Sequence, residues 1–124
     1  MSVELRHFKP LEFTQDGVVV FDKMNTSFLK KLDECRHQAG IKMSSPTSSY
    51  RSFYKNRMVG GSRHSMHLTG RAVDIPVKSG TERAKIIRAA LSLGLSVGIM
   101  ENAIHIDDRD DQILFHYYEN YTRK

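Results

Sequence analysis

Residues 60–75 of this 124-residue chain read GGSRHSMHLTGRAVDI. The stretch carries His64, His67 and Asp74, with Gly70 between the second histidine and the aspartate. An uninterrupted strand would place His67 and Asp74 on opposite faces, because they are seven residues apart and side chains alternate along a strand. Gly70 permits a turn or bulge that brings both side chains to one point. Imidazole and carboxylate suit zinc, so the stretch predicts part of a metal site, with His64 as an alternative to His67.

A third ligand is predicted on a later strand, residues 102–108, which read NAIHIDD. Alternation puts Ile104 and Ile106 on one face, expected to be the core face, and His105 and Asp107 on the other. His105 is therefore the best third ligand, and three protein ligands plus water are typical of a catalytic zinc site. The remaining histidines are expected to be structural or surface residues: His7, His37 and His116.

A predicted amphipathic helix precedes the opening stretch, between Asn25 and Gly40. Asn25 or Thr26 can cap it, because either side chain can accept a hydrogen bond from a free backbone N–H, and Gly40 can end it. Its expected buried residues recur at helical spacing: Phe28, Leu32, Cys35 and Ala39.

A second predicted helix follows the stretch, over residues 81–93. Ser79 and Glu82 form a capping-box pattern at its start, and Gly94 can terminate it. Its expected buried stripe comprises Ala84, Ile87, Ala90 and Leu91.

The strands are expected to form one small sheet. Residues 41–52 predict a short strand running into a polar loop that carries Arg51, and residues 71–77 predict a strand that Pro76 restricts to an edge or an end. Three late segments also read as strands: 95–100, 102–108 and 112–118. Because the last connections are too short for parallel crossovers, we expect one α+β domain over residues 1–124, with a small antiparallel sheet and helices packed on one side.

Composition excludes several classes of protein. The single cysteine, Cys35, rules out an intramolecular disulfide and a multi-cysteine zinc cluster. The longest apolar run, Val18 to Phe21, is too short to span a bilayer, and the first ten residues lack the apolar core of a secretory signal. We therefore expect cytoplasmic synthesis and no membrane insertion. The net charge of +5 comes from scattered residues and not from a basic stripe interleaved with aromatics, so no nucleic-acid partner is expected.

Three segments resemble one known family. SMHLTGRAVDI, residues 65–75, fits the Ser-x-His-x-x-Gly-x-Ala-x-Asp motif of the zinc D-Ala-D-Ala carboxypeptidase and phage endolysin peptidase family. HIDDR, residues 105–109, is similar to the second motif of that family, and SSYRSFYKNRMVGGS, residues 48–62, resembles its upstream segment in small peptidases. The resemblance covers nearly the whole chain and implies the hedgehog/DD-peptidase fold.

The resemblance implies a role for five residues. Zinc would be held by His67, Asp74 and His105, with water as the fourth ligand. Ser65, at the first motif position, would support the loop and lie beside the substrate. Arg51 matches an arginine that binds a substrate carboxylate or carbonyl, a task suited to the two parallel N–H donors of a guanidinium.

The chain departs from the family at the general base. Many members place Glu or His two or three residues before the last zinc histidine, but here those positions are Ala103 and Asn102, neither of which can accept a proton. Two acids remain as candidates: Asp107, on the same strand face as His105, and Glu101. Asp107 is preferred because it matches the His-x-Asp form of short phage-type relatives. Alternatively, Asp107 orients His105.

The resemblance implies a zinc metallopeptidase that hydrolyses peptide bonds in peptidoglycan stem peptides. It would act as a D-Ala-D-Ala carboxypeptidase or an endopeptidase, as a monomer, either on the cell wall when released during phage lysis or in the cytoplasm. The bond cleaved stays open. The main alternative is a non-catalytic zinc-binding domain of the same fold that recognises a partner, which the missing base favours. A nucleic-acid-binding protein is supported only by the net charge of +5.

Overall fold

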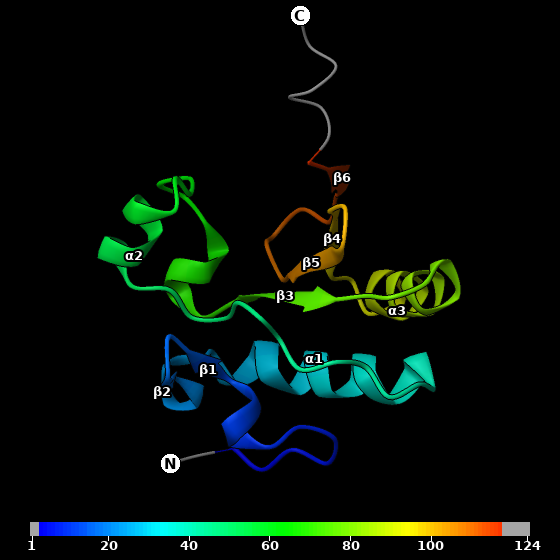
Figure 1. Cartoon of the computed structure of the whole chain (residues 1–124). Coiled ribbons are helices and arrows are strands. Elements are labelled where there is room, and N and C mark those ends of the chain that lie inside the picture. The colour runs from blue at the N-terminus through cyan, green and yellow to red at the C-terminus, as the bar shows by residue number, and fades with distance from the viewer. Residues whose placement is uncertain (1–2, 118–124) are drawn as a thin grey trace, which may run out of the picture.

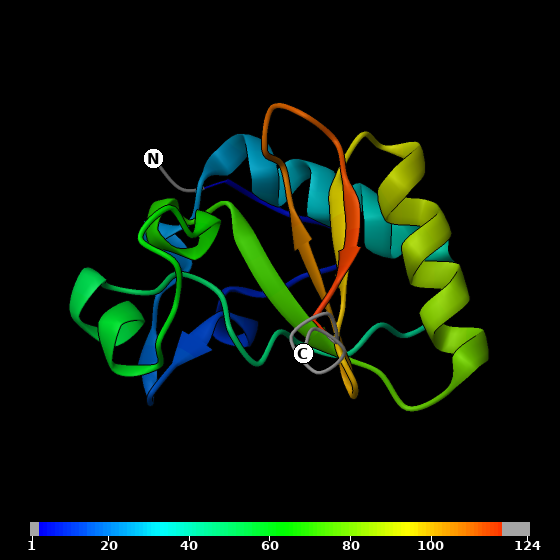
Figure 2. The ribbon, with the colours of Figure 1, turned by 90° about the horizontal axis from the view of Figure 1, so that it is seen from above.

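The computed structural model describes residues 3–117, so the last residues of the chain, including Tyr118 of the final predicted strand, lie outside it. Helices α1 and α3 pack together, and α1 lies across one face of a four-stranded sheet (Figure 1 and Figure 2). The elements in chain order are η1 (Pro10–Glu12), β1 (Thr14–Gln15), β2 (Val18–Val19), η2 (Phe21–Lys23), α1 (Thr26–Ala39), α2 (Phe53–Met58), η3 (Met66–Thr69), β3 (Ala72–Pro76), α3 (Gly80–Ser92), β4 (Ser96–Ile99), β5 (Ala103–Asp107) and β6 (Leu114–His116). The predicted α+β class is confirmed.

Helix α1 has the predicted caps. The Asn25 side chain accepts a hydrogen bond from the backbone N–H of Phe28 at 2.9 Å, and Gly40 ends the helix with a φ of 68°. A left-handed residue at this position favours glycine, which has no Cβ to clash. The predicted apolar face is confirmed, since all four members are buried: Phe28, Leu32, Cys35 and Ala39.

Helix α3 begins as predicted but buries a different stripe. The Ser79 hydroxyl accepts from the backbone N–H of Glu82 at 3.1 Å, as in a capping box. The prediction that Ala84 is buried is wrong: Ala84 is exposed, and Ile87 and Leu91 are only partly buried. The fully buried residues are Ile86, Ala89 and Ala90. The sequence offers two apolar diagonals, and packing against α1 and the sheet selects the second.

The main sheet has the strand order β3-β5-β4-β6. Strand β5 pairs antiparallel with β3 and with β4, as predicted. The final strand differs from the prediction, because β6 pairs parallel with β4. Residues 108–113 pass the end of β4 and set β6 on its far side, so β6 still runs opposite to β5, as a short connection requires.

Strand β3 lies at the edge of the sheet as predicted, but the additional strand expected in residues 41–52 is absent from the structure of residues 3–117. Strand β3 is an edge strand that ends at Pro76, as predicted. The short strand expected in residues 41–52 does not form, and this extended segment makes a single bridge, from Ser48 to Asp74. Helix α2 was not predicted, because only Asn56 is buried along it and no apolar periodicity marks it.

The core lies between the helices and one face of the sheet. Ile104 and Ile106 of β5 and Val73 and Ile75 of β3 are fully buried in it. Because side chains alternate along a strand, the residues between them lie on the opposite face of the sheet. That face carries the polar residues of the predicted site.

None of the helices in residues 3–117 combines the length and the hydrophobicity needed to cross a membrane.

Candidate metal centre

His67 lies on the short helix η3, which two flanking residues hold in place. The Ser65 hydroxyl accepts a hydrogen bond from the backbone N–H of His67 at 3.2 Å. Gly70 ends η3 with a φ of 69°, and a Cβ atom there would collide with the carbonyl oxygen of Lys23. Gly70 therefore makes the turn that was inferred between His67 and Asp74, and no other residue type fits that turn without strain.

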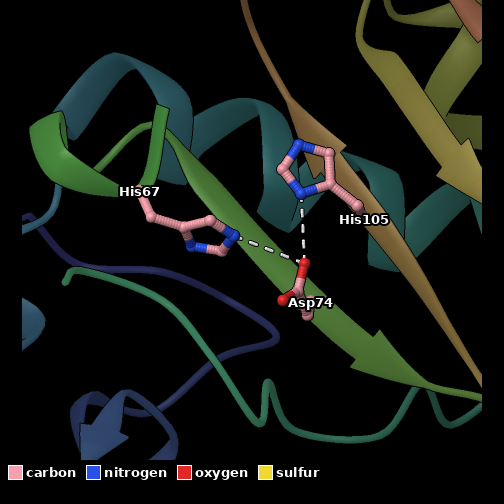
Figure 3. Close-up of side chains that lie close together, drawn as sticks. All are labelled: His67, Asp74 and His105. Carbon is pink, nitrogen blue, oxygen red and sulfur yellow. Dashed lines mark hydrogen bonds and ion pairs between the residues drawn. The ribbon is translucent and has the colours of Figure 1, made fainter. Parts of the chain in front are cut away.

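The other two residues, Asp74 and His105, lie side by side on neighbouring strands of the sheet. Asp74 of β3 and His105 of β5 are directly paired in the antiparallel register. Asp74 Oδ1 lies 3.1 Å from His105 Nδ1 and 3.4 Å from His67 Nε2 (Figure 3). One donor atom from each of the three residues lies within 4.8 Å of the others, so this group could hold a metal ion. The structure thus brings together the three residues expected as ligands.

The outer nitrogen of each imidazole is already engaged. His67 Nδ1 lies 2.8 Å from the carbonyl oxygen of Ser49, which can only accept, so Nδ1 carries the proton. His105 Nε2 lies 2.6 Å from Asp107 Oδ2. Arg109 donates from Nε to both oxygens of that carboxylate, at 3.0 and 3.2 Å, which keeps Asp107 an acceptor for the Nε2–H. These contacts leave His67 Nε2 and His105 Nδ1 facing Asp74.

The site concentrates negative charge. Burial alone would raise the pKa of Asp74, but hydrogen bonds from His105 and His67 hold it well below its usual range. Burial would likewise raise the pKa of Asp107, and hydrogen bonds from His105 and Arg109 lower it. Burial lowers the pKa of His105, and its contacts with Asp107 and Asp74 outweigh burial and raise it. Both carboxylates are therefore ionised and stabilise a positive charge between them.

The donor set fits a tetrahedral cation. Without a metal, a proton on His67 Nε2 or His105 Nδ1 is donated to the Asp74 oxygen, and a bound cation would take the place of these protons and meet the nitrogen lone pairs instead. Zinc bonds of about 2.0–2.1 Å to nitrogen and oxygen place neighbouring ligand atoms about 3.3 Å apart in a tetrahedron. The separations of 3.4 and 3.1 Å are close to that edge length. Imidazole and carboxylate donors with an open side suit zinc.

The group opens onto a cleft of about 830 Å³. Arg51 lies in its wall, where Nη1 donates to Asn56 Oδ1 at 3.0 Å and Nη2 to Ser48 Oγ at 3.1 Å. The backbone N–H of Arg51 also donates to the carbonyl of His67 at 3.0 Å, which ties the two segments together. The residues lining the cleft include Arg51, Ser65, His64, Arg109, Phe115 and Tyr117.

Glu101, a predicted candidate for the general base, and His64, the alternative ligand to His67, both lie apart from the three-residue group. Glu101 is exposed in the turn between β4 and β5, its backbone carbonyl accepts from Arg83, and it does not line the cleft. His64 lines the cleft on an exposed loop but is not a member of the group that could hold a metal. Of the histidines expected elsewhere, His7 and His37 lie 3.1 Å apart, ring nitrogen to ring nitrogen, at the start of the chain and on α1.

Among the cleft residues that sequence reasoning did not assign a role are Arg109, Phe115 and Tyr117. Arg109 follows Asp107 by two residues, so the HIDDR run held a signal for the ion pair. Phe115 and Tyr117 alternate along the last strand, but nothing in the sequence indicated that β6 would lie beside β4. Burial together with the charges of Asp74 and Asp107 raises the pKa of Tyr117 to about 12.

A family model described as Peptidase M15 matches residues 7–107. The chain belongs to the peptidase M15 family. The resemblance drawn from the sequence motifs is thereby confirmed. Comparison with curated proteins finds no match.

Membership of the M15 family is consistent with a metal-binding role for the group formed by His67, Asp74 and His105. M15 peptidases are zinc-dependent, and a zinc peptidase acts on a peptide substrate. The matched residues include the three-residue group, Arg51 and Asp107. They end at Asp107, so Arg109, Phe115 and Tyr117 lie beyond the matched region of this M15 chain.

Proposed function

We propose that this M15 chain is a zinc metallopeptidase that hydrolyses peptide bonds in peptidoglycan stem peptides. It would act as a D-Ala-D-Ala carboxypeptidase or as an endopeptidase, and it could function in phage lysis of the cell wall. The observation that carries the proposal is the convergence of His67, Asp74 and His105 at an open cleft with Arg51 in its wall. A catalytic zinc site needs three protein ligands and access for a substrate, and this cleft offers both.

The ligand atoms would be His67 Nε2, Asp74 Oδ1 and His105 Nδ1. When bound there, zinc would polarise the scissile carbonyl and lower the pKa of a coordinated water. The backbone of Ser49 and the side chain of Asp107 fix the tautomers of the two imidazoles, so their free lone pairs point inward. Such outer contacts orient metal-binding histidines and raise their basicity.

Asp107 fits the orienting role better than the role of general base. Its side chain is fully buried, and Arg109 and His105 engage both of its oxygens. It also contacts the Nε2 side of His105, the side opposite to the nitrogen that faces Asp74. A carboxylate held in this way is not placed to accept the proton of the attacking water. Asp107 is therefore proposed to hold His105 in place.

His64 then becomes a general-base candidate, in place of Glu101. An imidazole can accept a proton at neutral pH, and His64 lines the cleft that also contains the three proposed ligands. Glu101 is turned to solvent in the β4–β5 turn and is not among the residues lining the cleft. The loop that carries His64 is exposed, so its side chain is free of the packing that fixes Asp107.

Arg51 is proposed to bind a substrate carboxylate or carbonyl oxygen. Asn56 and Ser48 each take one of its donors and hold the guanidinium at the cleft wall. A guanidinium fixed in this way offers its remaining N–H groups to an oxygen without further loss of side-chain freedom. Ser65 is proposed to act on the loop, because its hydroxyl holds the backbone of His67.

Mass spectrometry of muropeptides tests the proposal. Zinc-loaded protein is expected to release a defined fragment, and the fragment identifies the bond cleaved. His67→Ala should release none, whereas Tyr54→Phe, an exposed change on α2 away from the cleft lining, should act like wild type. The second candidate function is a non-catalytic zinc-binding domain. It is favoured because the contacts of Asp107 with His105 and Arg109 leave this carboxylate poorly placed to act as a general base. Tight zinc binding without cleavage of any muropeptide would decide for that second function.

A further inference from the structure

We propose that Tyr117 contacts the substrate, its phenol hydroxyl donating a hydrogen bond to the substrate oxygen held beside His105 and Asp74. The inference rests on the proposed function, because it assigns one contact within the same cleft. Tyr117 lies beyond the region matched by the M15 family model, so the assignment depends on the geometry of this chain alone.

The ring of Tyr117 is held over the polar face of the sheet. Its backbone N–H donates to the carbonyl of Ile99 at 3.0 Å, which continues the parallel pairing of β6 with β4. The ring centroid lies 5.4 Å from that of Phe115 and 6.3 Å from that of His105, edge-on to the imidazole. Phe115 itself lies 5.8 Å from His105. The two aromatic rings therefore form a wall of the cleft against one proposed ligand.

This wall depends on Gly98. Gly98 pairs with His105 on one side and with Phe115 on the other. A Cβ atom at Gly98 would lie 2.6 Å from Cζ of Phe115 and 2.9 Å from Cε1 of Tyr117. Because both distances are too short for carbon atoms in contact, only glycine leaves room for the two rings beside His105.

The phenol group lies among the charges of the site. It interacts electrostatically with Asp74 and Asp107 and with Arg51 and Arg109, and the residue is 42% exposed. Within residues 3–117, no group forms a hydrogen bond with its hydroxyl. An O–H donor that has no acceptor among residues 3–117 and that lines the same cleft as the candidate metal centre is available to an oxygen of whatever occupies the cleft.

The chemistry of amide hydrolysis gives this donor a function. The carbonyl oxygen gains negative charge on the way to the tetrahedral state, and donors fixed in advance stabilise that charge without reorganising. Arg51 lies in the same cleft and can donate hydrogen bonds to the same carbonyl oxygen or to a carboxylate of the peptide. The contacts of the Tyr117 ring with Phe115 and His105 limit where its hydroxyl can lie, which favours a positioned donor.

Tyr117→Phe tests the proposal, because it removes the hydroxyl and keeps the ring. The matched control is Tyr54→Phe, which removes a hydroxyl from an exposed tyrosine outside the cleft lining. Two measurements are made on zinc-loaded protein: kcat and KM for muropeptide cleavage, and calorimetric binding of acetohydroxamate, a small oxygen ligand of zinc. Zinc content is measured for every variant.

The expected result is a fall in kcat of roughly ten- to a hundredfold, the usual effect of losing a hydrogen bond to a charged oxygen. Acetohydroxamate should also bind Tyr117→Phe more weakly, while zinc content and the Tyr54→Phe control stay at the wild-type level. Wild-type kcat and wild-type acetohydroxamate affinity in Tyr117→Phe would overturn the proposal, and so would loss of zinc from that variant. If wild type cleaves no muropeptide but Tyr117→Phe still weakens acetohydroxamate binding, the peptidase function fails and the contact stands.

Discussion

Asp74 and His105 are opposite partners in the β3–β5 pair, and Asp74 Oδ1 lies 3.1 Å from His105 Nδ1. The same register places Val73 opposite Ile106 and Ile75 opposite Ile104, all in the core. A slip of one residue would turn every one of these side chains to the other face of the sheet. The packing of the core therefore also fixes the two strand residues of the candidate metal centre.

Metal analysis should find about one zinc per chain, because residues 3–117 contain one group of three residues that could hold a metal. We expect zinc to be lost from His67→Ala, Asp74→Ala and His105→Ala after dialysis, because each change removes a donor atom. His64→Ala should retain zinc, since His64 is exposed and outside the group. Retention by Asp74→Ala together with loss from His64→Ala would show that the ligands are wrongly assigned.

Replacing Asp107 with Asn should weaken zinc binding by about ten- to a hundredfold, because the variant no longer holds His105 with a charged acceptor. Competition with a chelator measures this change. Asp110→Asn is the matched control, an exposed aspartate three residues further on that should leave zinc affinity unchanged. Full zinc affinity in Asp107→Asn combined with loss of cleavage would instead identify Asp107 as the general base.

Glu101→Gln should cleave muropeptides at close to the wild-type rate, because the Glu101 side chain is exposed and outside the cleft lining. His64→Asn should retain zinc and lose roughly a hundredfold or more in kcat, the contribution typical of a general base. Steady-state kinetics on the fragment identified by mass spectrometry measures both. The reverse result, with activity lost only from Glu101→Gln, would return the role to Glu101.

Stability should depend on pH through Glu12, which does not line the cleft of the candidate metal centre. Burial would raise the pKa of Glu12, but hydrogen bonds from Arg36 and Ser45 lower it. A carboxylate with a lowered pKa in the folded state stabilises the fold above its unfolded pKa, and this stabilisation is lost as the pH falls through the folded pKa. Glu12→Gln should therefore lower the free energy of unfolding by about 2 kcal/mol at pH 7, and much less in acid.

Urea denaturation at both pH values measures that difference. Glu34→Gln is the control, because the ion pair of Glu34 with Arg6 is exposed and should contribute less than about 1 kcal/mol. An equal loss of stability in Glu12→Gln at neutral and acid pH would mean that packing, and not charge, explains the effect.

The sequence was sufficient to predict features that depend on neighbouring residues. The caps of α1, the edge position of β3 and the alternation of Ile104, His105 and Ile106 all follow from local chemistry and the period of the element. Convergence of His67 with Asp74 was inferred because Gly70 makes a turn possible. The family resemblance then supplied the expected roles of these residues.

Features that depend on how distant elements meet could not be predicted in this way. The parallel pairing of β6 with β4 brings Phe115 and Tyr117 to His105, and no local pattern records that pairing. The buried stripe of α3 was misassigned because its sequence contains two apolar diagonals, and the choice depends on α1. The role of Asp107 depends on which imidazole nitrogen it contacts, which follows from side-chain rotamers and not from spacing.

Gly70 also joins the candidate metal centre to the start of α1. Its carbonyl accepts a hydrogen bond from the backbone N–H of Asn25 at 2.9 Å, and Asn25 is the residue whose side chain caps the helix. The loop that carries His67 and the first turn of α1 are thus joined by a main-chain hydrogen bond, and we expect them to open together. Local opening of this loop would require the helix start to open as well. Release of zinc on heating should therefore coincide with global unfolding, and bound metal should raise the melting temperature of the whole domain.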